Sequence, residues 1–74
     1  MTWSPRQREI IELVAREDLS YPKVAKRLDI HLSTVRVHVD RIVRRSGLNM
    51  RPKACLHWLY HHEVKPSADE VTTG

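Results

Sequence analysis

The sequence predicts a small all-α domain of four helices. Apolar residues recur at helical spacing in four successive segments, and serine or proline stands where three of these segments begin. No segment shows the alternating apolar and polar pattern of a strand. At 74 residues the chain is long enough for one small domain only. We expect this domain to span residues 1–63 and a polar, flexible tail to occupy residues 64–74.

The first helix is expected to begin after residue 4. Ser4 is a good N-cap, Pro5 suits the first helical position, and Gln7 completes a capping box with Ser4. Since no glycine follows, the helix should fade near Glu17 or Asp18. The apolar residues of this segment form a stripe that predicts a face buried in the core: Ile10, Ile11, Leu13 and Val14.

A short second helix and a longer third helix follow. Ser20 is the expected cap of the second helix, with Tyr21 and Pro22 in its first turn, and its apolar face holds Val24, Ala25 and Leu28. The third helix is expected over about residues 32–46, and Gly47 supplies the left-handed residue that commonly ends a helix. The spacing of four apolar side chains in it predicts a buried stripe: Val35, Val39, Ile42 and Val43.

The fourth helix should begin near Pro52 and is apolar around more than one face. A helix on a small core buries a single stripe, so we expect the remaining apolar surface to meet a second copy of the chain. The alternative is a wide contact with the core that leaves one aromatic side chain exposed. The predicted homodimer interface consists of Leu56, Trp58, Leu59 and Tyr60.

Positive charge is concentrated in the middle of the chain. The net charge is −1 over residues 1–20, +7 over residues 21–53 and −2 over residues 54–74. A localised basic patch favours a polyanionic partner, most often nucleic acid. The alternative is a solvated basic surface that has no acidic partner.

The connection between the second and third helices is very short. It consists of Asp29, Ile30 and at most His31, and a short helix joined in this way to a longer basic one predicts a helix-turn-helix. Ala25 is small where the two helices must approach, Ile30 fills the corner and Val35 anchors the third helix in the core. An ordinary helical hairpin could show the same spacing by chance.

These features resemble the LuxR/GerE-type (FixJ/NarL-type) DNA-binding domain over residues 3 to about 60. The resemblance implies a tetrahelical, four-helix helix-turn-helix bundle of LuxR/GerE type, DNA binding through the third helix and dimer contacts through the fourth. The residues that carry it are Ser4-Pro5-Arg6, Arg8-Glu9-Ile10, Leu19-Ser20, Val24-Ala25, Arg27-Leu28, Ile30, Ser33-Thr34-Val35-Arg36-Val37-His38 and Gly47-Leu48.

The chain departs from the pattern of that family at several positions. Lys23 replaces an acidic residue at the entry of the second helix, and Asp29 replaces the glycine of the turn. If the turn needs a positive φ, aspartate adopts it at a cost of about 1 kcal/mol. His31 replaces a serine or threonine cap, and Ser46 replaces a leucine. The fold is still expected, whereas the usual binding sequence of the family is not implied.

A recognition helix in a major groove offers one face to base edges. Arg36 can bond O6 and N7 of guanine together, and Val37 can contact a thymine methyl group, although a harmless exposed valine is the alternative. Asp40 can accept from cytosine or hold Arg36 by the i, i+4 spacing. The resemblance places these three residues at base-facing positions. The predicted base-contacting residues are Ser33, Arg36, Val37, Asp40 and Arg41.

Contacts to DNA phosphates should fix the register of the domain and supply much of its affinity. Counterion release predicts that affinity falls with salt with a slope of about −0.9 for each phosphate neutralised. A dimer on a two-fold site would double the contacts of one monomer. The predicted phosphate-contacting residues are Lys23, Thr34, His38 and Arg45, with Arg41 able to serve there as well.

No enzyme signature is present, since the sequence has no phosphate loop, no nucleophile and base arrangement and no carboxylate cluster. His57 and His61 have ligand spacing, but two histidines make a weak site and Cys55 lies on another side of the helix. We therefore expect no catalytic residue, metal or cofactor. No apolar run is long enough to span a membrane, and a cytoplasmic, nucleoid-associated protein is expected.

The predicted function is a sequence-specific, double-stranded-DNA-binding regulator of transcription that acts as a homodimer. The domain resembles the output domain of larger regulators, and the Met1 start favours a stand-alone regulator over an excised domain. Two alternatives share the fold. One is a protein-interaction module that binds RNA polymerase, a sigma factor or another regulator, and the other is promoter binding like that of sigma-factor region four.

Overall fold

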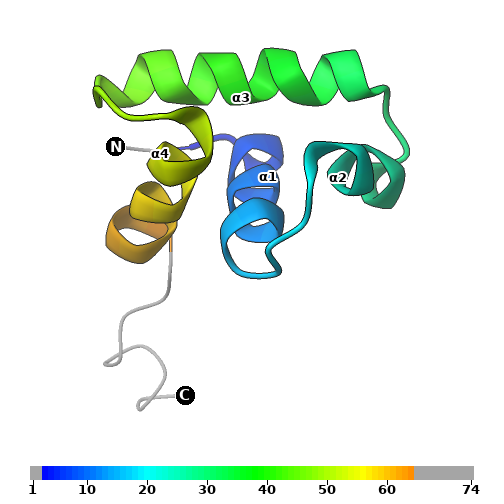
Figure 1. Cartoon of the computed structure of the whole chain (residues 1–74), viewed down its shortest axis with the longest axis horizontal. Coiled ribbons are helices and arrows are strands. Elements are labelled where there is room, and N and C mark those ends of the chain that lie inside the picture. The colour runs from blue at the N-terminus through cyan, green and yellow to red at the C-terminus, as the bar shows by residue number, and fades with distance from the viewer. Residues whose placement is uncertain (1–2, 65–74) are drawn as a thin grey trace.

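The computed structural model describes residues 3–64, and these residues form four α-helices followed by one turn of π-helix (Figure 1). This part of the chain contains no strand, and the predicted all-α, four-helix fold is confirmed. The elements are α1 (Pro5–Ala15), α2 (Tyr21–Leu28), α3 (Leu32–Ser46), α4 (Pro52–Leu59) and the π-helix η1 (Tyr60–Val64).

Helix α1 begins with the predicted capping box. The Ser4 hydroxyl accepts a hydrogen bond from the Gln7 backbone N–H at 3.2 Å, and the Gln7 side-chain oxygen accepts from the Ser4 N–H at 3.1 Å. The helix ends at Ala15, earlier than expected. The chain then turns at Asp18, which takes a positive φ of 53°, so an aspartate does here what a glycine commonly does.

The turn between α2 and α3 has the geometry that a helix-turn-helix requires. Asp29 adopts the left-handed conformation, with φ 56° and ψ 47°, and the Ile30 N–H donates to the Ala25 carbonyl at 3.0 Å. Ser20 and His31 occupy the N-cap positions of α2 and α3, but neither side chain makes a capping hydrogen bond. Backbone geometry and packing, rather than side-chain caps, therefore set where these two helices begin.

The end of α3 is tied to α4 through Ser46. Its hydroxyl donates to the Val43 carbonyl at 2.7 Å and accepts from the Leu48 N–H at 3.1 Å, while Gly47 takes a positive φ of 69° as predicted. The Cys55 sulfur lies 3.3 Å from the same oxygen. Since the hydroxyl proton is already used, the thiol is the donor of this contact. A serine at this position therefore fixes the turn into α4.

The core lies between α3 and the other helices. Figure 1 shows α3 along one edge of the molecule, with α1, α2 and α4 all on the same side of it. The stripe predicted in α3 is buried at three positions, and Val43 is half-buried. No polar or charged side chain is buried in the described residues. The buried set is Trp3, Ile10, Ile11, Leu13, Val14, Val24, Ala25, Val35, Val39, Ile42, Cys55, Leu56, Leu59 and Val64.

Both ends of the described chain contribute to this core. Trp3, which precedes α1, is only 5% exposed, and Val64 at the end of η1 is 4% exposed. The predicted tail begins at Val64, whereas the side chain of this residue packs in the bundle. The rest of the expected tail, residues 65–74, lies outside the described residues.

Candidate nucleic-acid interface

The outer face of α3 is free of contacts with the other helices. Figure 1 shows that α1, α2 and α4 lie on one side of α3 and leave its other side uncovered. Val35, Val39 and Ile42 are buried in the core, and most polar residues of α3 are exposed. At about 100° per residue, the predicted base-contacting residues form one continuous face of the helix. All five of them, Ser33, Arg36, Val37, Asp40 and Arg41, are exposed.

Val37 is the one large apolar side chain exposed on α3, at 47%. Its neighbours on the helix surface, three and four residues away, are Ser33, Thr34, Asp40 and Arg41, and they leave it exposed. The burial of Val35 and Val39 on the other side explains why Val37 cannot join the core, because the three residues point in different directions around the helix. An apolar group is therefore held at the centre of a charged face.

Asp40 pairs with a different arginine from the one expected. Its carboxylate lies 3.1 Å from Arg44 Nε, at the i, i+4 spacing, and the expectation that it holds Arg36 is wrong. The physical reason is direction along the helix, since an acid placed N-terminal to its basic partner forms the better pair. Arg36 and Arg41 have no carboxylate partner in the described part of the chain. Their guanidinium groups remain available to an external acceptor.

The edge of this face collects the residues predicted to contact phosphate. Thr34, His38 and Arg45 lie along one side of α3, on the side to which Arg41 also belongs. Thr34 and Arg45 are exposed and His38 is half-buried. Lys23 is exposed on α2 and has no carboxylate partner among the described residues. The structure thus brings the three α3 residues to one edge and places Lys23 on the neighbouring helix.

His38 lies between positive charges. Burial of the imidazole lowers the pKa of His38 below its ordinary value of 6.5, and the charges of Arg41 and Arg6 lower it further. The ring is therefore neutral at pH 7. Arg6 was not among the predicted site residues. Its guanidinium forms an exposed ion pair with Glu9 of the same helix, at 3.1 Å.

Arg45 is held by an aromatic ring. Its guanidinium carbon lies 5.4 Å from the centre of the Trp3 ring, which is a cation–π distance. Trp3 was not expected in the core or at this edge. Because the indole is buried, it gives the exposed Arg45 side chain a fixed support at the end of α3.

The outer face of α4 is less extensive than the sequence suggested. Leu56 and Leu59 are 0% exposed and pack inside their own bundle, so they present no surface to a second copy and that part of the predicted dimer interface is wrong. The alternative of a wide core contact applies to these two residues. Trp58 is 38% exposed and stacks on His62, with ring centres 4.2 Å apart. Tyr60 is half-buried and meets His61 edge-on.

The histidines of this region do not form a metal site in the part of the chain that the structure describes. No group of three or more His, Cys, Asp or Glu residues there is placed to hold a metal ion. The rings of His61 and His62 pack against their aromatic neighbours instead. Cys55 is buried against Ser46.

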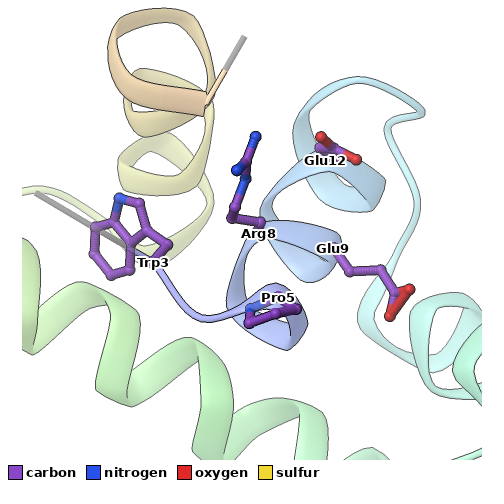
Figure 2. Close-up of a pocket in the computed structure, with 5 residues that line it drawn as sticks. All are labelled: Trp3, Pro5, Arg8, Glu9 and Glu12. Carbon is purple, nitrogen blue, oxygen red and sulfur yellow. The ribbon is translucent and has the colours of Figure 1, made fainter.

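A shallow hollow lies along α1, away from the outer face of α3 (Figure 2). It has a volume of about 390 Å³, and Figure 2 shows Arg8 and Glu12 projecting from the same side of the helix. The indole N–H of Trp3 is buried with no acceptor among the described residues. The charges around the hollow are mixed, so it does not favour a polyanion. Its lining residues are Trp3, Pro5, Arg8, Glu9 and Glu12.

A short helix, a left-handed turn and a longer helix with a cationic outer face define a helix-turn-helix domain of the DNA-binding class. Residues 4–45, more than half of the chain, match the family described as Sigma-70, region 4. The chain belongs to this Sigma-70 region 4 family. This family falls within the predicted class of helix-turn-helix DNA-binding domains. The LuxR/GerE type within that class stays a prediction.

Curated relatives point to the same class. The chain is 36% identical over 61 residues to the nitrate/nitrite response regulator protein NarL of Escherichia coli strain K12, and equally to the protein of that name in E. coli O6:H1. The match covers 82% of this chain but 27% of each relative, so the chain spans about a quarter of their length. No solved structure gives a significant match. No helix in residues 3–64 is long and apolar enough to cross a membrane.

Proposed function

We propose that this domain is a LuxR/GerE-type transcriptional regulator that binds double-stranded DNA at specific sequences through α3. The chain is 36% identical to the response regulator NarL, and this similarity supports the LuxR/GerE type. The observation that carries the proposal is the exposed face of α3, on which Arg36 has no carboxylate partner within residues 3–64 and Val37 is 47% exposed. A guanidinium and an isolated apolar group are the side chains that read guanine and thymine in a major groove.

The proposed contacts divide into two groups. Ser33, Arg36, Val37, Asp40 and Arg41 would face base edges, while the phosphate-contacting set would lie along the edge of the helix. The Asp40–Arg44 pair makes a contact from Asp40 to cytosine compete with an existing interaction, so Arg36 and Val37 would carry most of the sequence preference. The phosphate set is Lys23, Thr34, His38 and Arg45. Arg6 is added because its charge acts on His38, and a phosphate would compete with Glu9 for the exposed Arg6 guanidinium.

A homodimer through α4 fits this proposal. One copy offers only a few phosphate contacts, and a second copy on a two-fold site doubles them. Leu56 and Leu59 take no part in it. The remaining candidate surface is the exposed side of α4 around Trp58, with Tyr60 at its margin. Sedimentation of the wild type and of Trp58→Glu tests this pairing, since a dimer held there would dissociate in the variant.

The deciding experiment selects bound sequences from random duplex DNA and then measures affinity by fluorescence anisotropy over a range of salt. Arg36→Ala should weaken binding to the selected duplex and relax the preference at one base pair. Arg8→Ala is the matched control, because Arg8 is also an exposed arginine without a carboxylate partner among the described residues but lies on α1. Equal affinity of the two variants and the wild type would refute binding through the outer face of α3.

A second function has its own support in the family match. Sigma-70 region 4 domains give the precedent for promoter binding beside RNA polymerase, so polymerase is the alternative partner. Pull-down of core polymerase in the absence of DNA distinguishes the two. Capture of polymerase by the wild type and by Arg36→Ala alike would favour the protein-interaction function that shares this fold.

A further inference from the structure

Two hollows on the surface meet at Leu19, in the connection between α1 and α2. The first has a volume of about 330 Å³ and is lined by Leu19, Lys23, Lys26 and Arg27. The second has a volume of about 210 Å³ and is lined by Leu19, Ser20, Tyr21 and Lys53. Leu19 lines both hollows, and we call the two together the Leu19 trough. Its surface is mainly apolar in both halves.

The rim of the Leu19 trough is positively charged and only partly neutralised. Lys23 and Lys26 have no carboxylate partner in residues 3–64. Arg27 lies 3.4 Å from a Glu17 oxygen, and Lys53 lies 3.5 Å from an Asp18 oxygen. The side chains of both pairs are about half exposed or more, and such surface pairs contribute little. An incoming carboxylate can therefore replace either acid at small cost.

The trough also offers a hydrogen-bond donor. Tyr21 is half-buried, and this burial raises the pKa of its hydroxyl above the ordinary value. The group stays protonated at neutral pH and can donate to a carboxylate. The Leu19 trough therefore combines an apolar floor, a cationic rim and the phenolic donor of Tyr21.

We infer that the Leu19 trough is a docking site for an acidic, amphipathic helical segment of a partner protein. Two apolar side chains of the segment, one helical turn apart, would each fill one of the two hollows. Carboxylates on its flanks would then meet Lys26 and Arg27 on α2 and Lys53 on α4. Such a helix in a groove is a common mode of recognition between proteins.

A segment of protein fits this surface better than duplex DNA does. A phosphodiester chain has charge to offer the lysines but no apolar group for the floor around Leu19, which would stay wet or be left unfilled. The trough also lies on α2 and the α1–α2 connection, and not on the outer face of α3 proposed to meet DNA (Figure 1). Only Lys23 belongs to both surfaces, so it is not used in the test.

The test uses a short fluorescent peptide with leucines at i, i+4 spacing and glutamates on its flanks. A scrambled peptide of the same composition is the probe for unspecific attraction. Lys26→Glu should weaken binding of the ordered peptide by roughly five- to tenfold, since attraction becomes repulsion at one site. Arg8→Glu changes the net charge equally at an exposed position outside the trough and should leave the affinity within about twofold.

Leu19→Ala should also weaken the ordered peptide, and its thermal unfolding is checked because Leu19 packs partly against the core. If that variant unfolds, Lys26→Glu still decides, as Lys26 is exposed. Equal binding of ordered and scrambled peptides, or equal binding by Lys26→Glu and Arg8→Glu, would overturn the proposal.

Duplex binding by the same variants separates this proposal from the proposed function. Lys26→Glu should bind the selected duplex as tightly as the control variant does. If it loses the duplex and binds the peptide normally, the trough belongs to the DNA surface and the docking proposal is wrong while DNA binding stands. If no variant or wild type binds duplex but the ordered peptide is held through Lys26, the docking proposal stands without the proposed function.

Discussion

The outer faces of α3 and α4 differ in how much of their predicted surface the fold leaves free. On α3, every residue predicted to meet bases is exposed. On α4, two of the four residues predicted to meet a second copy are completely buried in their own domain. For both helices, the spacing of apolar residues is the basis of the predicted exposed face. The contrast arises because α3 keeps its apolar residues, Val37 excepted, on one side, whereas α4 has apolar residues on several sides.

This difference indicates which surface is the better candidate for the proposed DNA contacts. The face of α3 is backed by three buried aliphatic residues, so its charged side chains stand on a rigid support. On α4 the large apolar side chain left exposed is Trp58, which stacks on His62 of η1. We expect substitutions on α3 to change binding without changing stability, and substitutions of the α4 leucines to do the reverse.

The largest effect is expected for Leu56→Ala. Loss of a fully buried leucine should lower the free energy of unfolding by about 2–5 kcal/mol, because it removes apolar contacts and leaves a cavity. Denaturant unfolding followed by circular dichroism measures the change. Trp58→Ala is the control and should cost less than about 1 kcal/mol, since its ring is partly exposed. If Leu56→Ala is as stable as the wild type, Leu56 is not a core residue and again becomes a candidate for the dimer interface.

The next largest effect is expected for Arg36→Ala on DNA affinity. Loss of a two-point contact to guanine should cost about 1–3 kcal/mol of binding free energy at the selected site. Unfolding should be unchanged, because the side chain is exposed and makes no internal ion pair in the described residues. Anisotropy titrations of the selected duplex and of a duplex with that base pair changed provide the measurement. Equal losses on both duplexes would show a contact to phosphate instead.

Substitution of Val37 is expected to have a smaller effect on DNA affinity, and it tests a contact with a single methyl group. If its side chain meets a thymine methyl, Val37→Ala should cost about 1 kcal/mol. Replacement of that thymine by uracil removes only the methyl group and should cost a similar amount. The double change should cost little more than either single change, as expected for partners in contact. Additive losses would mean that Val37 does not contact this methyl group.

The fold could be predicted where local signals decide it. The capping box at Ser4 and Gln7, the left-handed Asp29 and Gly47, and the buried stripe of α3 all follow from short-range chemistry. Helix bounds agreed to within a few residues for the same reason. Helix α1 ended earlier than expected because the Glu17 and Leu19 N–H groups donate to the Glu12 and Leu13 carbonyls, which leaves the helical pattern before Asp18 takes its positive φ.

The site could be predicted less completely, because tertiary packing decides the rest. The sequence does not say how many sides of α4 the core covers, and the burial of Trp3 and Val64 at the two ends extends that core. The Trp3 ring beneath Arg45 is likewise a contact between distant parts of the chain. The Asp40–Arg44 pair is different. The rule that an acid prefers a base on its C-terminal side was already enough to choose Arg44 over Arg36.

Arg45 is expected to affect the salt dependence more than the affinity at one salt concentration. If it neutralises one phosphate, Arg45→Ala should reduce the slope of log affinity against log salt by about 0.9. Arg16→Ala, an exposed arginine at the end of α1, should leave the slope unchanged. Trp3→Leu keeps an apolar side chain in the core but removes the cation–π support of Arg45. It should weaken binding with the slope nearly retained, whereas an unchanged affinity would mean that the ring does not position the guanidinium.

The smallest effect is expected from His38, through pH. Its pKa in the folded domain lies below the ordinary 6.5, so the unfolded chain takes up its proton first as the pH falls. Stability should therefore decline as the pH drops from neutrality through 6.5, and this contribution levels off below the folded pKa. His38→Gln should lose less stability over the same range. Thermal midpoints across this range give the comparison. Parallel curves for His38→Gln and the wild type would show that the arginines and burial around His38 do not act on it, and would weaken the assignment of Arg6 to the rim of the α3 face.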